Sequence, residues 1–219
     1  MRPKLPSDSG LYRVVANNCA GVPASSSNAV VSVTDLPANL ILLTNHVWRY
    51  EQSNTDLGVS WREVSFNDSS WPQGRGLHAF ENLAAINALT NTVLNLSNNS
   101  VQVPTYYFRA QFVFTNDPSL VVIQSTNYFD DGAIVYLNGV EALRFNMPSA
   151  GVTHNTLALA ANPQGEGTFM ISNIPVNLLV QGTNTIAVEV HQNSLTSSDI
   201  VFGWSMTAFF LPSTQLAIT

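Results

Sequence analysis

The chain has 219 residues, of which 45% are hydrophobic and only 10% are charged, and its formal net charge is -6. A chain so rich in apolar residues and poor in charge is not disordered, and its length suffices for one large β domain, or one domain plus a fragment. Its few arginines are scattered singly, so no basic stripe exists to neutralise phosphates, which excludes nucleic acid as a partner. The apolar runs are too short to span a bilayer, so we expect no membrane insertion.

The first predicted element is a β-hairpin over residues 8–33 (DSGLYRVVANNCAGVPASSSNAVVSV). The spacing Asp8-x-Gly10-x-Tyr12 resembles the tyrosine corner of an I-set-like immunoglobulin domain, and the residues after it resemble strands F and G. The resemblance implies that residues 1–35 are a partial immunoglobulin-like segment without strands A to E. Since the facing strands are absent, we predict that the hairpin packs on the rest of the chain or pairs with a neighbouring chain, which would be self-association.

From residue 36 onward the chain shows the two-residue period of β-strands and no sustained helical period. The predicted strands include 105–114, 120–125, 133–137, 140–145, 185–191 and 202–208. Asn138-Gly139 separates two of them and predicts a tight hairpin turn, because both turn positions require a positive φ. Only the segment ENLAAINAL, at residues 81–89, is compatible with a short turn of helix.

Four segments of this second part occur in the order of a known fold. They are WRYEQSNTDLGVSWREVSFNDSSWPQG, TYYFRAQFVF, FDDGAIVYLNGVEALRFNMPS and LLVQGTNTIAVEVHQNSLTSSDIVF. Together they resemble the galactose-binding-like jelly roll of large secreted bacterial proteins and, more distantly, the sugar-binding domain of β-galactosidase-type glycoside hydrolases. The resemblance implies an all-β, jelly-roll β-sandwich over residues 36–219, preceded by the immunoglobulin-like hairpin remnant. It also implies an extracellular or cell-surface location.

Aromatic side chains are the first candidates for sugar contact, because an exposed ring can pack against the apolar face of a pyranose. We predict that the tryptophans fill the interior of the sandwich instead: Trp48, Trp61, Trp71 and Trp204. Phe80, Tyr128 and Phe129 lie beside predicted turns and are better candidates for an exposed platform.

The triplet Asp130-Asp131-Gly132 is the most suggestive chemical motif. Adjacent carboxylates at a strand entry can converge on a hard cation, and we therefore name Asp130 and Asp131 as candidate ligands of calcium and of a glycan. The triplet resembles the DDG of calcium-dependent lectins of the protective-antigen-like type, where the paired aspartates bind calcium and sugar. The alternative is that one aspartate caps a turn through backbone amides while the other faces water.

A polar loop that joins the last two predicted strands supplies the other candidate ligand-binding residues: His191, Gln192, Asn193 and Asp199. Imidazole, amide and carboxylate groups suit a network of sugar hydroxyls. The alternative is that His191 pairs with Asp199 and closes the loop as a structural latch.

Two functions of different class follow from these residues. The first is a non-catalytic extracellular carbohydrate-binding module whose partner is a glycan or polysaccharide. The second is a structural or self-assembling module that uses residues 1–35 as its docking element. We do not expect an enzyme, because the sequence has no nucleophile elbow, no zinc-protease motif and no phosphate loop, and it marks no pair of carboxylates for glycosidase chemistry.

Overall fold

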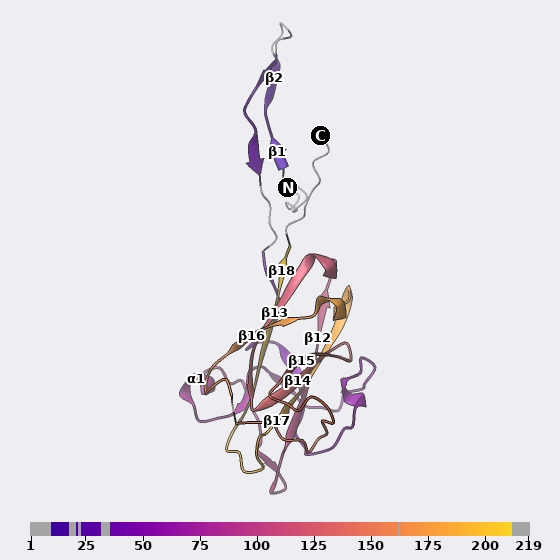
Figure 1. Cartoon of the computed structure of the whole chain (residues 1–219), viewed down its shortest axis with the longest axis vertical. Coiled ribbons are helices and arrows are strands. Elements are labelled where there is room, and N and C mark those ends of the chain that lie inside the picture. The colour runs from indigo at the N-terminus through magenta and orange to yellow at the C-terminus, as the bar shows by residue number, and fades with distance from the viewer. Residues whose placement is uncertain (1–9, 18–20, 22, 32–35, 162, 212–219) are drawn as a thin grey trace.

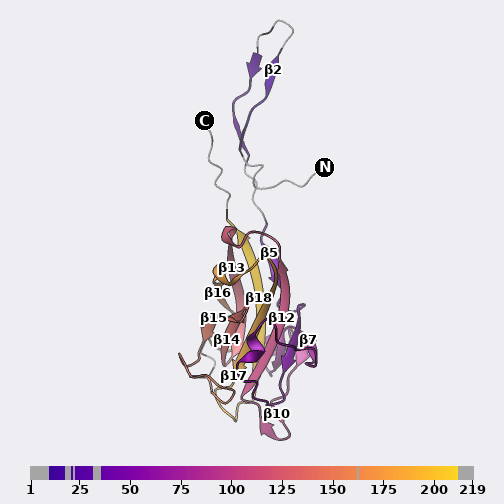
Figure 2. The same ribbon diagram turned by 90° about the vertical axis from the view of Figure 1, so that its right-hand side faces the viewer.

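A computed structural model describes residues 10–17, 21, 23–31, 36–161 and 163–211. Its main body is a β-sandwich, and a narrow hairpin projects from one end of it (Figures 1 and 2). The predicted all-β sandwich is therefore confirmed. Its galactose-binding-like type stays a prediction.

The first sheet contains six strands, all joined to their neighbours in antiparallel register. In spatial order these strands are β15 (Val140–Phe145), β14 (Gly132–Leu137), β17 (Gly182–His191), β12 (Thr105–Phe114), β6 (Val47–Glu51) and β7 (Gln73–Arg75). The long central pair β12–β17 runs in register from Thr105↔His191 to Phe114↔Gly182, so it fixes both ends of the sheet.

The second sheet faces the first and is also built around two long strands. Its order is β16 (Met170–Ile174), β13 (Val121–Asp130), β18 (Ile200–Phe210), β8 (His78–Phe80) and β9 (Thr92–Val93), with β5 (Ala38–Ile41) also paired to β18. Only β8 and β9 pair in parallel among the described strands. Successive long strands cross between the sheets, because β12, β14 and β17 belong to the first while β13, β16 and β18 belong to the second.

Short elements connect the sheets. They are α1 (Ala84–Asn87), a two-stranded ribbon of β10 (Ser97–Asn98) and β11 (Val101–Gln102), and the 3-10 turns η2 (Ser60–Arg62), η3 (Pro118–Leu120) and η4 (Val176–Leu178). Helix α1 lies inside the segment that the sequence marks as compatible with a helical turn. No helix among the described residues is long and apolar enough to cross a membrane.

The core between the sheets is aromatic. Phe202 stacks on Phe108 with ring centroids 4.0 Å apart and meets the edge of Trp48 at 4.8 Å. All four tryptophans are buried, which confirms that they pack in the interior of the domain. Trp48 and Trp204 belong to this core, whereas Trp61 and Trp71 lie in a second apolar cluster. Phe129 is also fully buried, against Phe202 and Trp204, so its predicted place on an exposed platform is wrong.

The turn Asn138-Gly139 joins β14 to β15, as the sequence predicts. Asn138 has a φ of 52° and Gly139 a φ of 84°, so both residues occupy the left-handed region. The Asn138 amide also donates to the Leu178 carbonyl oxygen at 2.8 Å and accepts from the Thr185 backbone nitrogen at 2.9 Å. The asparagine therefore forms the turn and ties it to two neighbouring segments.

The projecting hairpin pairs β1 (Gly10–Tyr12) with β4 (Ala29–Val31) and β2 (Val15–Asn17) with β3 (Pro23–Ser25). The predicted hairpin is thus present. Its apolar side chains face solvent, however, since Leu11 is 67% exposed and Val30 is 80% exposed. The expectation that it packs on the sandwich is wrong, because the hairpin continues beyond the end of the sandwich instead of folding back on it (Figure 2). Strand pairing with another chain stays a prediction.

Candidate cation and glycan site

The ends of β8, β13 and β17 and the starts of β14 and β18 lie at the end of the sandwich opposite the hairpin (Figure 1). The strand register places Phe80 opposite Ile200, Asp130 opposite Val201, and Gly132 opposite His191. Candidate residues more than a hundred positions apart in the sequence are therefore brought to one end of the molecule.

Three carboxylates converge at this end. Oxygen atoms of Glu81, Glu166 and Asp199 all lie within 4.8 Å of one another. They come from three separate loops, which follow β8, precede β16 and precede β18. Calcium binds oxygens at about 2.3 to 2.6 Å, so oxygens that share one ion lie up to about 5 Å apart. The spacing of these three carboxylates therefore fits one hard cation.

The Asp130 carboxyl group lies in the same acidic environment. It is 2% exposed, and its Oδ2 atom has no hydrogen-bond partner among the described residues. Burial, and then the charges of Asp131, Asp199 and Glu166, raise the pKa of Asp130 to about 9. A buried carboxylate surrounded by other carboxylates is costly unless a cation or a proton compensates it.

Asp131 holds the turn between β13 and β14. Its Oδ2 atom accepts a hydrogen bond from the Asn193 backbone nitrogen at 2.7 Å, as expected for a turn cap. The expectation that the other aspartate faces water is wrong, because both side chains are at most 4% exposed. The loop before β16 covers the turn, and Gln164 donates from this loop to the Phe129 carbonyl oxygen at 2.8 Å.

His191 and Gln192 are fully buried, so the expectation that they belong to an exposed loop is wrong. His191 is the last residue of β17, and its Nε2 lies 3.4 Å from a carboxylate oxygen of Glu189. Its Nδ1 lies 2.7 Å from the Thr156 carbonyl oxygen. The predicted His191–Asp199 latch is therefore wrong. Instead, the Gln192 side chain closes the loop by donating to the Asp199 carbonyl oxygen at 2.8 Å.

The aromatic candidates Phe80 and Tyr128 differ from each other. Phe80 is 41% exposed and directly precedes Glu81 in the sequence. Tyr128 is fully buried in a small apolar cluster with Leu77 and Val201, which corrects its prediction as an exposed platform. Its hydroxyl group donates a hydrogen bond to Glu166 Oε2 at 3.2 Å and so helps to hold this carboxylate in position.

Sequence reasoning did not identify Glu81 or Glu166. Glu81 precedes the short helix, and Glu166 lies between Gly165 and Gly167, which have φ values of 86° and 71°. Neither glutamate belongs to a recognisable motif. An acidic residue flanked by two glycines was the one local signal, since it indicates a tight, exposed turn.

Comparison with solved structures shows a likeness of fold to part of several glycosidase chains. No protein-family model and no curated protein matches the sequence. The solved structures of similar fold include a calcium-binding mutant of Bacteroides uniformis beta-glucuronidase 2, with 14% identity over 79% of this chain and a TM-score of 0.51. A Bacteroides uniformis beta-glucuronidase matches with 17% identity over 79% of this chain and a TM-score of 0.50.

A beta-glucuronidase from glycoside hydrolase family 2 also matches, with 14% identity over 82% of this chain and a TM-score of 0.47. The chain spans 18% of the length of each of these three enzymes. At this level of identity the likeness is one of fold alone.

Proposed function

We propose that the chain is a non-catalytic carbohydrate-binding module that acts outside the cell or at its surface. The observation that carries the proposal is the convergence of Glu81, Glu166 and Asp199, with the exposed Phe80 next to Glu81 in the sequence. With Asp130, these carboxylates would hold a calcium ion, which supplies open coordination positions for sugar hydroxyl groups. Phe80 would pack against the apolar face of the sugar ring.

The geometry of the carboxylates supports a binding role over hydrolysis. Glycosidases place two carboxyl groups on opposite sides of a cleft, about 5 to 9.5 Å apart, and the proton donor must reach the glycosidic oxygen. Here three carboxylates converge on one point within 4.8 Å. Burial raises the pKa of both Asp130 and Asp199, but Asp130 is only 2% exposed, and Asp199 lies within the convergent group and not across a cleft from it.

The test is a glycan array with and without calcium, combined with thermal unfolding at increasing calcium concentration. Calcium at a hundred times its dissociation constant should stabilise the fold by about 2.7 kcal/mol. Glu81→Gln should remove this effect while preserving the loop, because glutamine can still accept the hydrogen bond from the Leu83 backbone nitrogen, now 2.8 Å from Glu81 Oε1. Glu63→Gln, on an exposed glutamate outside the group, is the matched control. The absence of any calcium-dependent shift, together with no retained glycan, would refute the proposal.

A second candidate function is a structural or self-assembling module, and the projecting hairpin favours it. Its exposed apolar side chains lie on strands whose outer edges are open to pairing. In that case, deletion of residues 1–34 would convert an oligomer into a folded monomer in analytical ultracentrifugation. An unchanged molecular mass would rule out assembly through this segment.

A further inference from the structure

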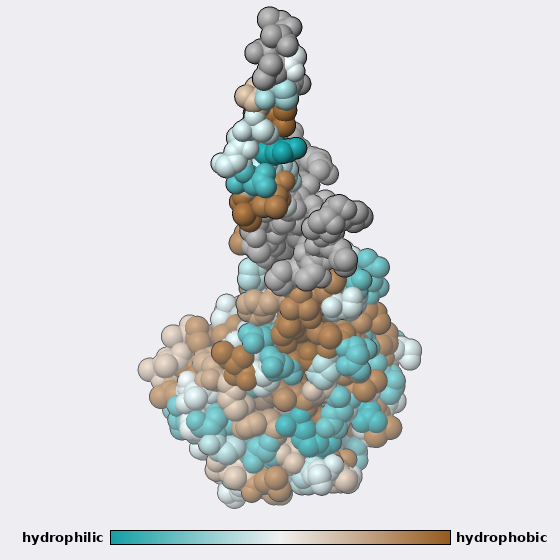
Figure 3. Space-filling view, turned by 45° about the horizontal axis from the view of Figure 1, so that its top comes forward, coloured by the Kyte–Doolittle hydropathy of each residue, from teal (hydrophilic) through white to brown (hydrophobic). Residues whose placement is uncertain are grey.

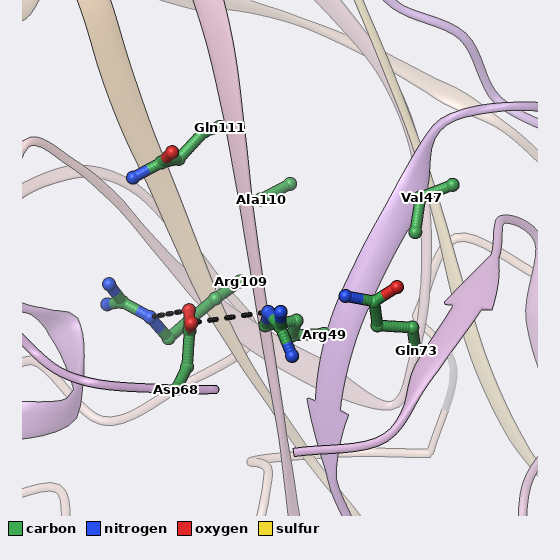
Figure 4. A pocket seen from close by; sticks show the side chains of 7 residues that line it. All are labelled: Val47, Arg49, Asp68, Gln73, Arg109, Ala110 and Gln111. Carbon is green, nitrogen blue, oxygen red and sulfur yellow. Dashed lines mark hydrogen bonds and ion pairs between the residues drawn. The ribbon is translucent and has the colours of Figure 1, made fainter. Parts of the chain in front are cut away.

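A second polar site lies on the outer face of the first sheet, away from the acidic end. It is a pocket of about 320 Å³ over strands β6, β7 and β12 (Figure 4). Arg49 and Val47 come from β6, Gln73 from β7, and Arg109 and Gln111 from β12, while Asp68 reaches in from the loop before β7. The volume is within the range of pockets that hold small ligands.

One carboxylate and two guanidinium groups form the base of this pocket. Arg109 Nε donates to Asp68 Oδ2 at 2.8 Å, and Arg49 Nε lies 3.3 Å from Asp68 Oδ1 (Figure 4). Arg109 is 2% exposed and also donates to the Trp61 carbonyl oxygen. The pocket therefore carries a local formal charge of one positive unit in a chain whose net charge is -6.

Several polar groups of the pocket have no partner among the described residues. Neither the Nη2 atom of Arg49 nor that of Arg109 makes a hydrogen bond there, and the side-chain amides of Gln73 and Gln111 make none either. A latch that only ties the Asp68 loop to the sheet explains the bonded nitrogens. Arg49 belongs to the same latch, since its Nη1 atom donates to the carbonyl oxygens of Ser69 and Trp71 at 3.2 Å. The latch still leaves one Nη2 atom on each guanidinium group, and the two glutamine amides, available to a ligand.

We infer that this pocket binds a uronic-acid residue of an acidic glycan. The sugar carboxylate accepts one charge-assisted hydrogen bond from the Nη2 atom of Arg49 and one from that of Arg109, the two nitrogens that the Asp68 loop leaves unbonded. Ring hydroxyl groups bond to Asp68 and to the two glutamine amides, and Val47, which is 47% exposed, contacts the apolar edge of the ring. The saccharide part of this inference rests on the proposed carbohydrate-binding function. The inference that the pocket binds a carboxylate group rests on the charge of the pocket alone.

The acidic end of the sandwich does not suit such a ligand. Its carboxylates repel an anionic sugar unless a cation is bound, whereas the arginine pocket attracts it. The two sites are therefore separable: binding measured in the presence of EDTA reports on the arginine pocket alone.

The experiment is calorimetric titration in EDTA with three ligands: tri-galacturonate, neutral galactotriose and the non-sugar carboxylate tricarballylate. We expect tri-galacturonate to bind at least about tenfold more tightly than either of the others, and to weaken as salt is added. Arg49→Gln should reduce this affinity by about tenfold or more. Gln111→Ala should also weaken it, and it should not affect folding, because the Gln111 side chain is exposed and makes no hydrogen bond to the described residues.

Arg75→Gln is the matched control. Arg75 lies on β7, and Arg75 Nη1 donates to Asn45 Oδ1 at 2.8 Å; it does not line the pocket, so its loss removes the same charge from the same sheet. Equal affinity for galactotriose or tricarballylate, or equal losses in Arg75→Gln and Arg49→Gln, would overturn the inference. No binding of tri-galacturonate would overturn it as well, whatever calcium does at the acidic end.

Discussion

Replacement of Asp130 by asparagine should change how the stability of the protein depends on pH. The carboxyl group is 2% exposed, and burial followed by the charges of Asp131, Asp199 and Glu166 raises its pKa from 3.8 to about 9. Between these two values the folded protein holds a proton that the unfolded chain releases. Because the folded state binds more protons, the stability from this group is fully present below about pH 4 and is lost as pH rises towards 9.

The expected difference in the free energy of unfolding follows from the one proton that the folded state holds and the unfolded chain releases. A difference of one bound proton changes the free energy of unfolding by about 1.36 kcal/mol per pH unit. From about pH 5 to about pH 7 the wild type should therefore lose about 2.7 kcal/mol relative to Asp130→Asn, which has no proton to release. Subtracting one curve from the other removes the contribution of carboxylates elsewhere. The expected slope does not depend on the exact folded pKa, provided that it stays above this range.

Urea unfolding in EDTA at intervals between about pH 5 and pH 8 measures this difference. Asp117→Asn is the control, because Asp117 is exposed and accepts hydrogen bonds from the backbone nitrogen and hydroxyl group of Ser119. Its curve should run parallel to that of the wild type. Added calcium should flatten the wild-type curve, because the ion compensates the carboxylates in place of the proton. A constant difference between wild type and Asp130→Asn across this pH range would show that the burial argument is incorrect.

Three further predictions concern the framework. Trp48→Ala should lower the free energy of unfolding by about 3 to 5 kcal/mol in urea titrations, because Trp48 is fully buried against Phe202. Asn138→Ala should cost about 1 to 3 kcal/mol in the same assay, since it leaves the Thr185 backbone nitrogen without its acceptor; a negligible change would contradict the role of this turn. Deletion of residues 1–34 should leave the melting temperature of the sandwich unchanged in calorimetry, because the described hairpin side chains are exposed; a large drop would show that the segment belongs to the core.

The parts of the fold that the sequence predicts correctly depend on local signals. The two-residue period of residues 185–191 identifies a strand, although both faces of that strand are buried and not only one. Asn138-Gly139 encodes its own turn geometry. The apolar face of its strand predicts that Trp204 is buried, and the resemblance to the jelly roll predicts the same of the other three tryptophans; all four are buried. Each of these features can be read within about ten neighbouring residues.

The incorrect predictions at the candidate site concern burial and contacts that depend on residues far away in the sequence. Tyr128 and His191 lie near strand ends, where a sequence pattern does not show whether a distant loop covers them. The loop before β16 covers Tyr128, and the Thr156 segment covers His191. Likewise, Glu81 joins Asp199 only because β8 pairs with β18, and Asp68 meets Arg109 only because a loop crosses the outer face of the first sheet. These contacts depend on strand register, which the local pattern leaves open.

The placement of charge argues that both polar sites are more than structural. With only 10% of its residues charged, this chain nevertheless buries Arg109 and Asp130 almost completely. Burial of a charge costs several kcal/mol, and replacement of a buried ion pair by well-packed apolar residues is often neutral or stabilising. Stability alone would therefore favour apolar side chains at both positions, as in the rest of the sandwich. A cation at Asp130, in place of its proton, and a carboxylate at Arg109 and Arg49 would each offset that cost through binding. Asp130 and Arg109 are therefore two buried ionisable positions where mutation should separate ligand affinity from stability.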